Sequence, residues 1–463
     1  MFSEYSTGMV HKMNDTATKQ NFLFSNTELR RLILPLILEQ TLVITVGMVD
    51  TMMVSSVGEA AVSGVSLVDM LVNLVFSVFA ALATGGAVVT SQYLGAGKTK
   101  DACNSSRQLI VTSAVFALSV MAVCMAACRP ILSFFFGSIE ADVMQNAQLY
   151  LLISALSFPF MGIYGASSAL FRAMGNSMIV LKSSCIMNII NVVGNAIGIF
   201  VLHMGVLGVA IPSLISRIVA AAILYLLLRR PVYEVHLNKG KFHFDGKVIR
   251  KILYIGIPSG IESGIFQLGR VAVVSIISGF GTVQIAANGV ANSLDSMGCI
   301  MGQAMSLAMI TVIGQCVGAA SLAQVKYYTK KLMMITYAGM IVINVTILLS
   351  LPVVLKLYGL SPETTALAGQ LVWIHDGIAM FLWPISFVLP NMMRACNDVR
   401  YTMVISIFSM VVFRIGLSLV MGVNMGMGAV GVWWAMIVDW IFRSACFVGR
   451  YLKGTWRKFC VLK

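Results

Sequence analysis

The sequence has little charge. Lys, Arg, Asp and Glu make up only 11% of its 463 residues, whereas 58% of the residues are hydrophobic and the mean hydropathy is +0.89. No class of soluble globular protein has that balance, so the composition indicates a protein that crosses a membrane many times. Residues 1–28 are polar and lack the apolar core of a cleavable signal peptide, and we interpret them as a cytoplasmic lead-in.

Motifs of common catalytic sites are absent as well. The sequence has no Walker motif, no Gly-x-Ser-x-Gly turn and no histidines at metalloprotease spacing, so we expect neither an enzyme nor direct driving by ATP. It has no pore motif of an ion channel. The nine cysteines are scattered, and Cys124 and Cys128 have no histidine or carboxylate beside them, so we predict no disulfide or metal site there. We expect no cofactor.

Long apolar runs dominate the chain instead. Twelve of them are long enough to span a bilayer, so the sequence predicts an all-α polytopic membrane protein with twelve transmembrane helices. The runs lie near residues 29–54, 62–93, 108–127, 143–170, 177–202, 206–229, 251–278, 283–314, 330–355, 364–392, 401–423 and 428–449.

The distribution of basic residues orients these runs. Lysines and arginines lie in every second loop, for example Lys98 and Lys100, whereas the opposite loops hold only Arg129 and Lys356. This is the asymmetry of the positive-inside rule, and it explains the net charge of +14 better than binding to nucleic acid does. We therefore expect a multi-pass protein of the cell membrane, embedded in the lipid bilayer, with both termini in the cytoplasm and no nucleic-acid partner.

The chain also contains an internal repeat. A polar, basic connection at 230–250 separates six runs at 29–229 from six at 251–450, and a basic cytoplasmic tail follows at 451–463. The two halves match at an offset of about 223 residues, so we predict two pseudo-symmetric six-helix bundles related by an axis along the membrane normal. The matching segments include Pro35-x-x-x-Glu39 with Pro258-x-x-x-Glu262, Gln92-x-x-Gly95 with Gln315-x-x-Gly318, and Arg172-Ala with Arg394-Ala. The arginine pair departs from the common offset by one residue.

Several segments in this order resemble a known family. They are Val49–Thr51, Gln92–Gly97, Leu170–Asn176, Gly208–Ser213, Gly256–Glu262 and Leu389–Asp398. With twelve helices, they make the chain similar to the multidrug and toxic compound extrusion (MATE) transporters over essentially its whole length. The resemblance implies a V-shaped molecule of two lobes that exports bulky, often cationic organic compounds against an inward flow of Na⁺ or H⁺. We expect it to act as a monomer.

A second function is also compatible with the sequence. A flippase or exporter of lipid-linked or amphipathic precursors, from the same superfamily, would need more helices or a strongly basic central cavity. Four arginines inside the apolar runs keep this alternative open, although they do not cluster in the sequence. They are Arg217, Arg270, Arg414 and Arg443.

A buried acid in the first run is the strongest candidate for a cation site. A carboxylate at Asp50 costs about 2.5–3.5 kcal/mol within a membrane span, and such residues are functional by default. By the resemblance, the cation ligands are Asp50, Asn191, Asn195 and Ser213, with Asn195 where some relatives carry Asp. The residues themselves agree, because Asn191 and Asn195 share one helix face and offer the oxygens that a hard cation prefers.

Two other roles remain for this group. The carboxylate could carry a proton instead of Na⁺, and the two asparagines could simply tie helices together. Asp69, on the second run, is a weaker member that could face a wet vestibule. The offset places Val273 opposite Asp50 and Arg414 close to the position of Asn191, so the second half lacks the acid. A polar group that only held the six-helix fold would be expected in both halves, so the repeat argues for a functional role.

The second half carries its own polar group. Glu262, Asp295, His375, Asp376 and Arg270 lie within apolar runs. The acids could attract a cationic substrate into the cleft, or they could neutralise Arg270 and Arg414 in a structural network, since buried charges are usually paired.

Two prolines mark candidate hinges. Pro35 and Pro258 each lie one turn before a repeated acid, Glu39 or Glu262, and a proline bends a helix and frees a backbone carbonyl. We predict that Pro35, Glu39 and Pro258 have gating roles on the cytoplasmic side of the cleft.

Overall fold

The computed structural model describes residues 22–137, 140–237 and 242–460. Parts of the predicted lead-in (1–21), of the connection between the halves (238–241) and of the tail (461–463) lie outside the described residues. Within the described part, every regular element is a helix, which confirms the predicted all-α class. Eleven of these helices are long and apolar enough to cross a membrane, and a bent pair provides a twelfth.

The described residues of the first half contain nine helical elements. Helix α2 starts at a capping box, in which the Ser25 hydroxyl accepts from the backbone N–H of Glu28 and the Glu28 carboxylate accepts from that of Ser25. The elements are α2 (Asn26–Ser55), α3 (Glu59–Gly95), α4 (Thr99–Ala126), α5 (Cys128–Phe136), α6 (Ala141–Leu156), α7 (Phe158–Ala173), α8 (Ser177–Ala196), the π-helix η2 (Ile197–Val201) and α9 (Leu207–Leu228).

The second half repeats this order with more breaks. Its elements are α10 (Gly246–Ser278), α11 (Thr282–Gly298), α12 (Ile300–Gly318), α13 (Leu322–Leu357), α14 (Pro362–Trp383), the π-helix η3 (Pro384–Val388), α15 (Leu389–Ala395), α16 (Val399–Ser409), the π-helices η4 (Met410–Gly416) and η5 (Ser418–Asn424), α17 (Gly428–Lys453) and the 3₁₀ helix η6 (Thr455–Phe459).

Two predicted runs are broken. The run at 143–170 is formed by α6 and α7, which meet at Ser157 with a bend of 47°. The run at 283–314 is divided between α11 and α12 at Cys299. Hydropathy averaged over a whole run does not reveal such breaks.

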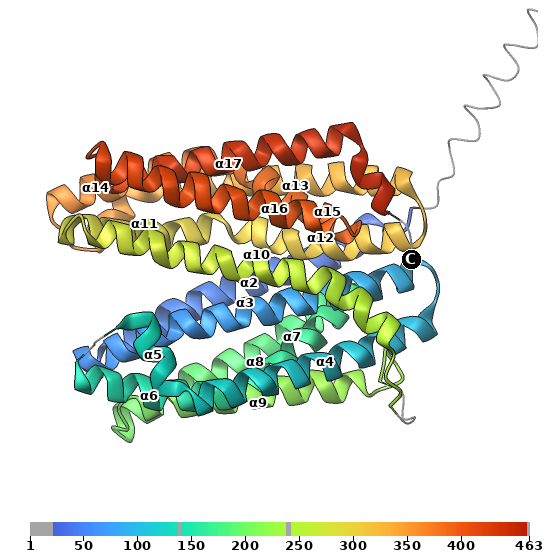
Figure 1. The fold of residues 1–463 in the computed structure, drawn as a ribbon, viewed down its shortest axis with the longest axis horizontal. Coiled ribbons are helices and arrows are strands. Elements are labelled where there is room, and N and C mark those ends of the chain that lie inside the picture. The colour runs from blue at the N-terminus through green and yellow to red at the C-terminus, as the bar shows by residue number, and fades with distance from the viewer. Residues whose placement is uncertain (1–21, 138–139, 238–241, 461–463) are drawn as a thin grey trace, which may run out of the picture.

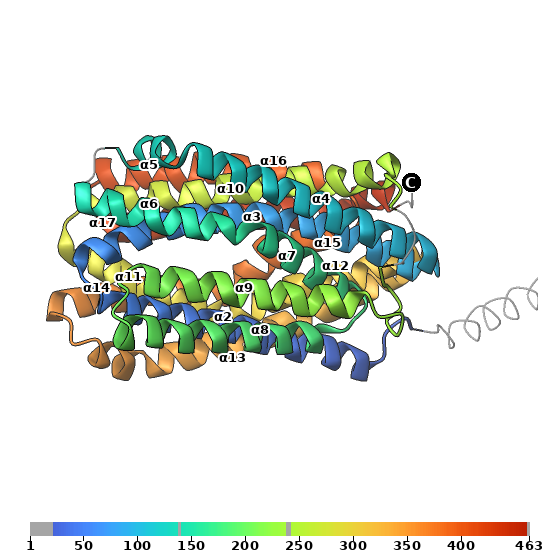
Figure 2. The ribbon, with the colours of Figure 1, turned by 90° about the horizontal axis from the view of Figure 1, so that it is seen from below.

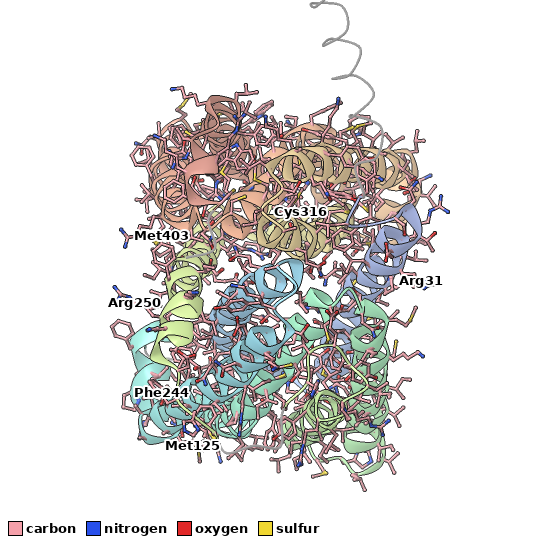
Figure 3. All side chains as sticks on the ribbon, turned by 90° about the vertical axis from the view of Figure 1, so that its right-hand side faces the viewer. Arg31, Met125, Phe244, Arg250, Cys316 and Met403 are labelled. Carbon is pink, nitrogen blue, oxygen red and sulfur yellow. The ribbon has the colours of Figure 1, made fainter. Side chains whose placement is uncertain are left out.

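The helices form two bundles. In Figure 1, α4 to α9 lie in the lower bundle and α11 to α17 in the upper one, with α2, α3 and α10 between them. The view turned by 90° shows most helices running along the longest axis of the molecule (Figure 2). Viewed end-on, the bundles lie one above the other, and Arg31 and Arg250 lie on opposite flanks (Figure 3).

Each bundle receives the start of one helix from the other half of the chain. Leu29, Leu32 and Leu36 of α2 belong to the apolar core of the second bundle. Val248 and Ile252 of α10 belong to a core of the first bundle. The first helix of each half therefore crosses from one bundle to the other, which fastens the two together.

The repeated Gln-x-x-Gly segments join the bundles at one end of the molecule. We call it the basic end, because Lys98, Lys100 and Lys326 follow these segments in the sequence. The Gln92 side chain donates to the backbone oxygen of Ala395 at 2.9 Å, and the Gln315 side chain donates to that of Ala173 at 2.8 Å. Gly95 and Gly318 allow this approach, because a Cβ on either would overlap the backbone of the opposite glutamine. The contact is nearly symmetric, as the repeat predicts.

Candidate functional site

The four predicted cation ligands lie together. Asp50 is near the end of α2, Asn191 and Asn195 are one turn apart on α8, and Ser213 is on α9. The Asn195 amide donates to Asp50 Oδ1 at 3.0 Å, and the Asn191 amide and the Ser213 hydroxyl are hydrogen-bonded at 2.9 Å. Both asparagines and Ser213 are buried. The structure thus brings a carboxylate, two amides and a hydroxyl from three helices to one place.

The amide of Asn191 has two possible orientations in this site. With its nitrogen toward Ser213, its oxygen faces the Asp50 carboxylate, and two acceptors then meet without a hydrogen between them. With the amide turned over, its nitrogen donates to the two Asp50 oxygens at 3.0 and 2.9 Å and its oxygen accepts from Ser213. The first orientation suits a site that holds a cation or a proton, and the second suits a bare carboxylate.

Asn195 contributes a further acceptor. Its oxygen is buried and has no hydrogen-bond partner among the described residues. A buried acceptor without a donor is costly, and a hard cation satisfies several such oxygens at once. The group of oxygens therefore fits a cation bound at Asp50.

A cavity of about 560 Å³ adjoins this group. Asp50, Asn191 and Ser213 line it, and so does Asp69, which accepts a hydrogen bond from the Tyr150 hydroxyl at 3.1 Å. The weaker candidate Asp69 is thus part of the same site.

Arg217 is a member of this cavity that the sequence analysis did not assign. It donates to Ser157 Oγ at 2.8 Å, and its guanidinium lies 4.9 Å from the ring centre of Phe76. Its spacing of four residues from Ser213 is the signal that could have placed it on the same helix face. In the described part of the chain, no ion pair within 4.0 Å neutralises Arg217, Asp50 or Asp69.

The second bundle has a much smaller cavity at the repeated position. It measures about 50 Å³, and its lining includes Arg270, Val273 and Asn292, which the offset of 223 places opposite Gly47, Asp50 and Asp69. Arg270 thus lies where the first bundle has a glycine. This half has neither the acid nor the space.

The repeated acids are each paired with a repeated arginine. Glu39 lies 2.5 Å from Arg172, and Glu262 lies 2.6 Å from Arg394. Sequence analysis offered Arg270 and Arg414 as partners for the acids of the second half, and for Glu262 this pairing was wrong. The basic partner is Arg394, which lies two residues beyond the predicted run at 364–392. Both glutamates are buried against their partners.

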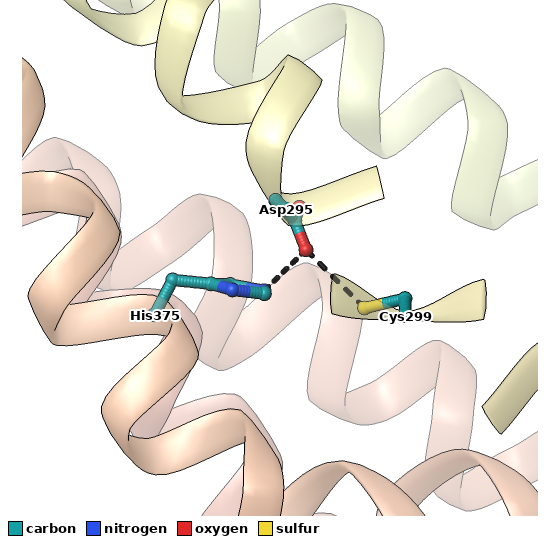
Figure 4. Close-up of side chains that lie close together, drawn as sticks. All are labelled: Asp295, Cys299 and His375. Atoms are coloured by element: carbon teal, nitrogen blue, oxygen red, sulfur yellow. Dashed lines mark hydrogen bonds and ion pairs between the residues drawn. The ribbon is translucent and has the colours of Figure 1, made fainter. Parts of the chain in front are cut away.

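Three of the other predicted residues of the second half meet in one cluster. His375 Nε2 lies 2.6 Å from Asp295 Oδ1, and His375 Nδ1 lies 2.6 Å from Asp376 Oδ1. Figure 4 shows the Asp295 carboxylate pointing toward both His375 and Cys299, whose thiol donates to Asp295 at 3.3 Å. Cys299 was missed because it stands at a helix break. Arg270 is exposed and Glu262 is paired elsewhere, so neither joins this cluster by direct contact.

The hinge residues lie at the bundle junction. Pro35 lies inside α2 and Pro258 inside α10, the two helices whose first turns cross into the opposite core. Glu39 and Glu262 follow them by one turn. The Glu–Arg pairs therefore fasten these two helices to their own bundles directly after the crossing.

Comparison with known proteins matches this architecture. The model of the family described as MatE matches residues 35–197 and again 258–420, an offset of 223 residues. The transporter YisQ of Bacillus subtilis, described as uncharacterized, is 25% identical over 91% of this chain and 93% of its own length. A probable multidrug resistance protein NorM of Thermotoga maritima is 26% identical over 94% of both chains. An outward-facing structure of a multidrug resistance MATE family transporter superposes with a TM-score of 0.86 at 17% identity, over 93% of this chain and 96% of that one.

Proposed function

This chain belongs to the MatE family of membrane transporters, and we propose that it exports bulky, mainly cationic organic compounds by antiport with Na⁺ or H⁺. The proposal includes a monomer in the cell membrane with both termini in the cytoplasm. Its two lobes, at 29–229 and 251–450, would rock about the basic end. The relatives described as multidrug resistance proteins support the class of substrate.

One observation carries the proposal. Asp50 lies on the wall of a cavity of about 560 Å³, held by amides rather than by a base. A carboxylate that served only to hold the fold would be expected to have an arginine or lysine beside it. Asp50 instead has uncharged amide neighbours, Asn191 and Asn195, whose oxygens could serve a cation that arrives and leaves.

The charges of the cavity suggest how the coupling ion and the exported compound exclude each other. When ionised, Asp50 and Asp69 leave the cavity one negative charge in excess after Arg217 is counted, which favours a cationic compound. Na⁺ or H⁺ on Asp50 removes that excess. A bound coupling ion would therefore weaken the binding of the exported compound, and this difference in affinity is what can drive the cycle.

The coupling ion would also change the hydrogen bonds around Asp50. With the ion bound, the Asn191 oxygen would face Asp50. Without it, the Asn191 nitrogen would donate to both Asp50 oxygens, the orientation that satisfies every partner of this amide. Because Asp50 is on α2, which crosses between the bundles, this exchange is placed to act on the angle between the lobes.

Export of lipid-linked precursors is not favoured. A cavity for a pyrophosphate group would need several bases, whereas this one has two acids and a single arginine.

The test is efflux of a cationic dye from everted vesicles under an imposed Na⁺ or pH gradient. We expect Asp50→Asn to abolish the acceleration by the gradient, while Asp142→Asn, at an exposed acid of the same lobe, retains it. Acceleration by only one of the two gradients identifies the coupling ion. Unaltered gradient-driven efflux in Asp50→Asn would contradict the role given to Asp50.

A further inference from the structure

The cluster of Asp295, Cys299 and His375 contains three different kinds of metal ligand. A carboxylate oxygen, a thiol sulfur and an imidazole nitrogen lie within 4.8 Å of one another. They come from α11, from the break between α11 and α12, and from α14 (Figure 4). A set of N, O and S ligands at such distances is typical of Zn²⁺ and related divalent transition metals.

Asp376 completes the arrangement. It is fully buried and contacts His375 Nδ1, so the other ring nitrogen, Nε2, is the one that faces Asp295. A carboxylate on the distal nitrogen of a histidine fixes the ring and its tautomer in metal sites. The second oxygen of Asp376 has no hydrogen-bond partner among the described residues, which leaves a buried polar atom in the cluster.

A purely structural ion pair explains only part of this geometry. It accounts for the contacts of His375 with Asp295 and Asp376, but it leaves one oxygen of Asp376 buried without a partner among the described residues. It also gives no reason for a fully buried thiol directed at Asp295. A divalent ion would bind the Asp295 carboxylate and the Cys299 thiolate in place of two protons, so the net charge of the cluster would stay the same.

The first half of the chain has no counterpart of this cluster at the repeated positions. The offset of 223 places Val72, Phe76 and Leu152 of the first half opposite Asp295, Cys299 and His375, so the other lobe has only apolar residues there. The first half also keeps α3 continuous where the second half breaks at Cys299. The Asn344 side chain donates to the backbone oxygen of Gly298 at 3.2 Å, which holds this break in place.

We propose that Asp295, Cys299 and His375 bind a divalent transition-metal ion of the Zn²⁺ class, with Asp376 as a positioning residue. Binding releases the Cys299 thiol proton and the proton on His375 Nε2 to solvent. The Asp295 side chain is 23% exposed whereas that of His375 is 1% exposed, so the ion enters past Asp295. Three protein ligands leave a fourth position for water or a small anion.

The test uses Co²⁺ as a spectroscopic substitute for Zn²⁺ on the purified full-length protein in detergent. We expect one equivalent of Co²⁺ to give visible bands of a tetrahedral site and a near-ultraviolet band from thiolate coordination. Excess Zn²⁺ displaces it, and Mg²⁺ does not. Cys299→Ser removes the thiolate band, while Cys316→Ser, at a buried cysteine within α12, keeps it.

Two further variants keep the test informative if Cys299→Ser fails to fold. Asp295→Asn changes the most accessible ligand, and Asp376→Asn is expected to weaken Co²⁺ binding about 10–100-fold while the thiolate band remains at saturating metal. Zn²⁺ is expected to raise the thermal unfolding temperature of the parent but not of Cys299→Ser. Absence of a stoichiometric Co²⁺ spectrum in the folded parent, or the same band in Cys299→Ser, overturns the proposal. Neither result depends on drug export.

Discussion

The two lobes share a fold, but the residues at the repeated cavity position differ between them. In the first lobe, Gly47 leaves space beside Asp50, and the cavity measures about 560 Å³. In the second lobe, Arg270 and Val273 take those two positions, and the cavity measures about 50 Å³. The residues that hold the fold are kept in both copies, whereas the residues of the cavity are not. A duplicated scaffold thus separates structure from chemistry within one chain.

The largest expected effect comes from making the first lobe resemble the second. Gly47→Arg places a base beside Asp50 in a cavity that has room for it, since nothing lies within 4 Å of a Cβ at Gly47. We expect gradient-driven dye efflux to fall at least about tenfold, which corresponds to only about 1.4 kcal/mol of lost cation binding. Gly47→Ala is the matched control and should transport normally. Full transport by a folded Gly47→Arg protein would mean that the cavity is not the coupling site.

The next prediction concerns the contact that the lobes share. A Cβ at Gly318 overlaps the backbone of Gln92, so Gly318→Ala must push the lobes apart at the basic end. Spin labels at the exposed residues Lys100 and Lys326, one in each lobe, should show a longer or broader distance distribution. The same substitution at Gly165, where a Cβ meets nothing within 4 Å, should leave the distribution unchanged. Gly95→Ala should act like Gly318→Ala, because the contact is nearly symmetric.

The two Glu–Arg pairs should behave alike in spite of the functional difference between the lobes. Glu39→Gln and Glu262→Gln each leave a partly buried arginine without its counter-charge but keep one hydrogen-bonding group. We expect each to lower the free energy of unfolding by about 1–3 kcal/mol. Thermal unfolding checks the stability, and dye efflux checks the function. If Glu262→Gln loses transport without losing stability, Glu262 belongs to the transport site rather than to the scaffold.

Much of the fold followed from the sequence. Hydropathy predicted the helices, and the repeat predicted two pseudo-symmetric bundles, although it did not predict that the two Gln-x-x-Gly segments touch. The amide pair on α8 was predictable because residues i and i+4 share a face. The partners of Glu39 and Glu262 were not, because a pairing across a bundle depends on how each helix is rotated. Cys299 was missed for a related reason, since hydropathy averaged over a whole run does not show a break inside it.

The smallest expected effect concerns the second acid of the cavity. Asp69→Asn removes one negative charge from the lining but leaves the oxygens around Asp50 in place. We expect binding of a monovalent cationic dye to weaken by about 1 kcal/mol, or roughly fivefold, because the charge acts across a wet cavity. A neutral compound of similar size should bind as before. Tracer or fluorescence binding to the purified protein measures both.

A matched variant separates the charge of Asp69 from its hydrogen bond. Tyr150→Phe removes the donor at 3.1 Å but keeps the carboxylate, so it should leave the preference for cationic dyes unchanged. If Asp69→Asn weakens neutral and cationic compounds equally, Asp69 shapes the cavity rather than attracting charge. The first lobe would then differ from the second by a single functional acid, Asp50, and substrate selection would rest on cavity volume, which Gly47 permits and Arg270 denies.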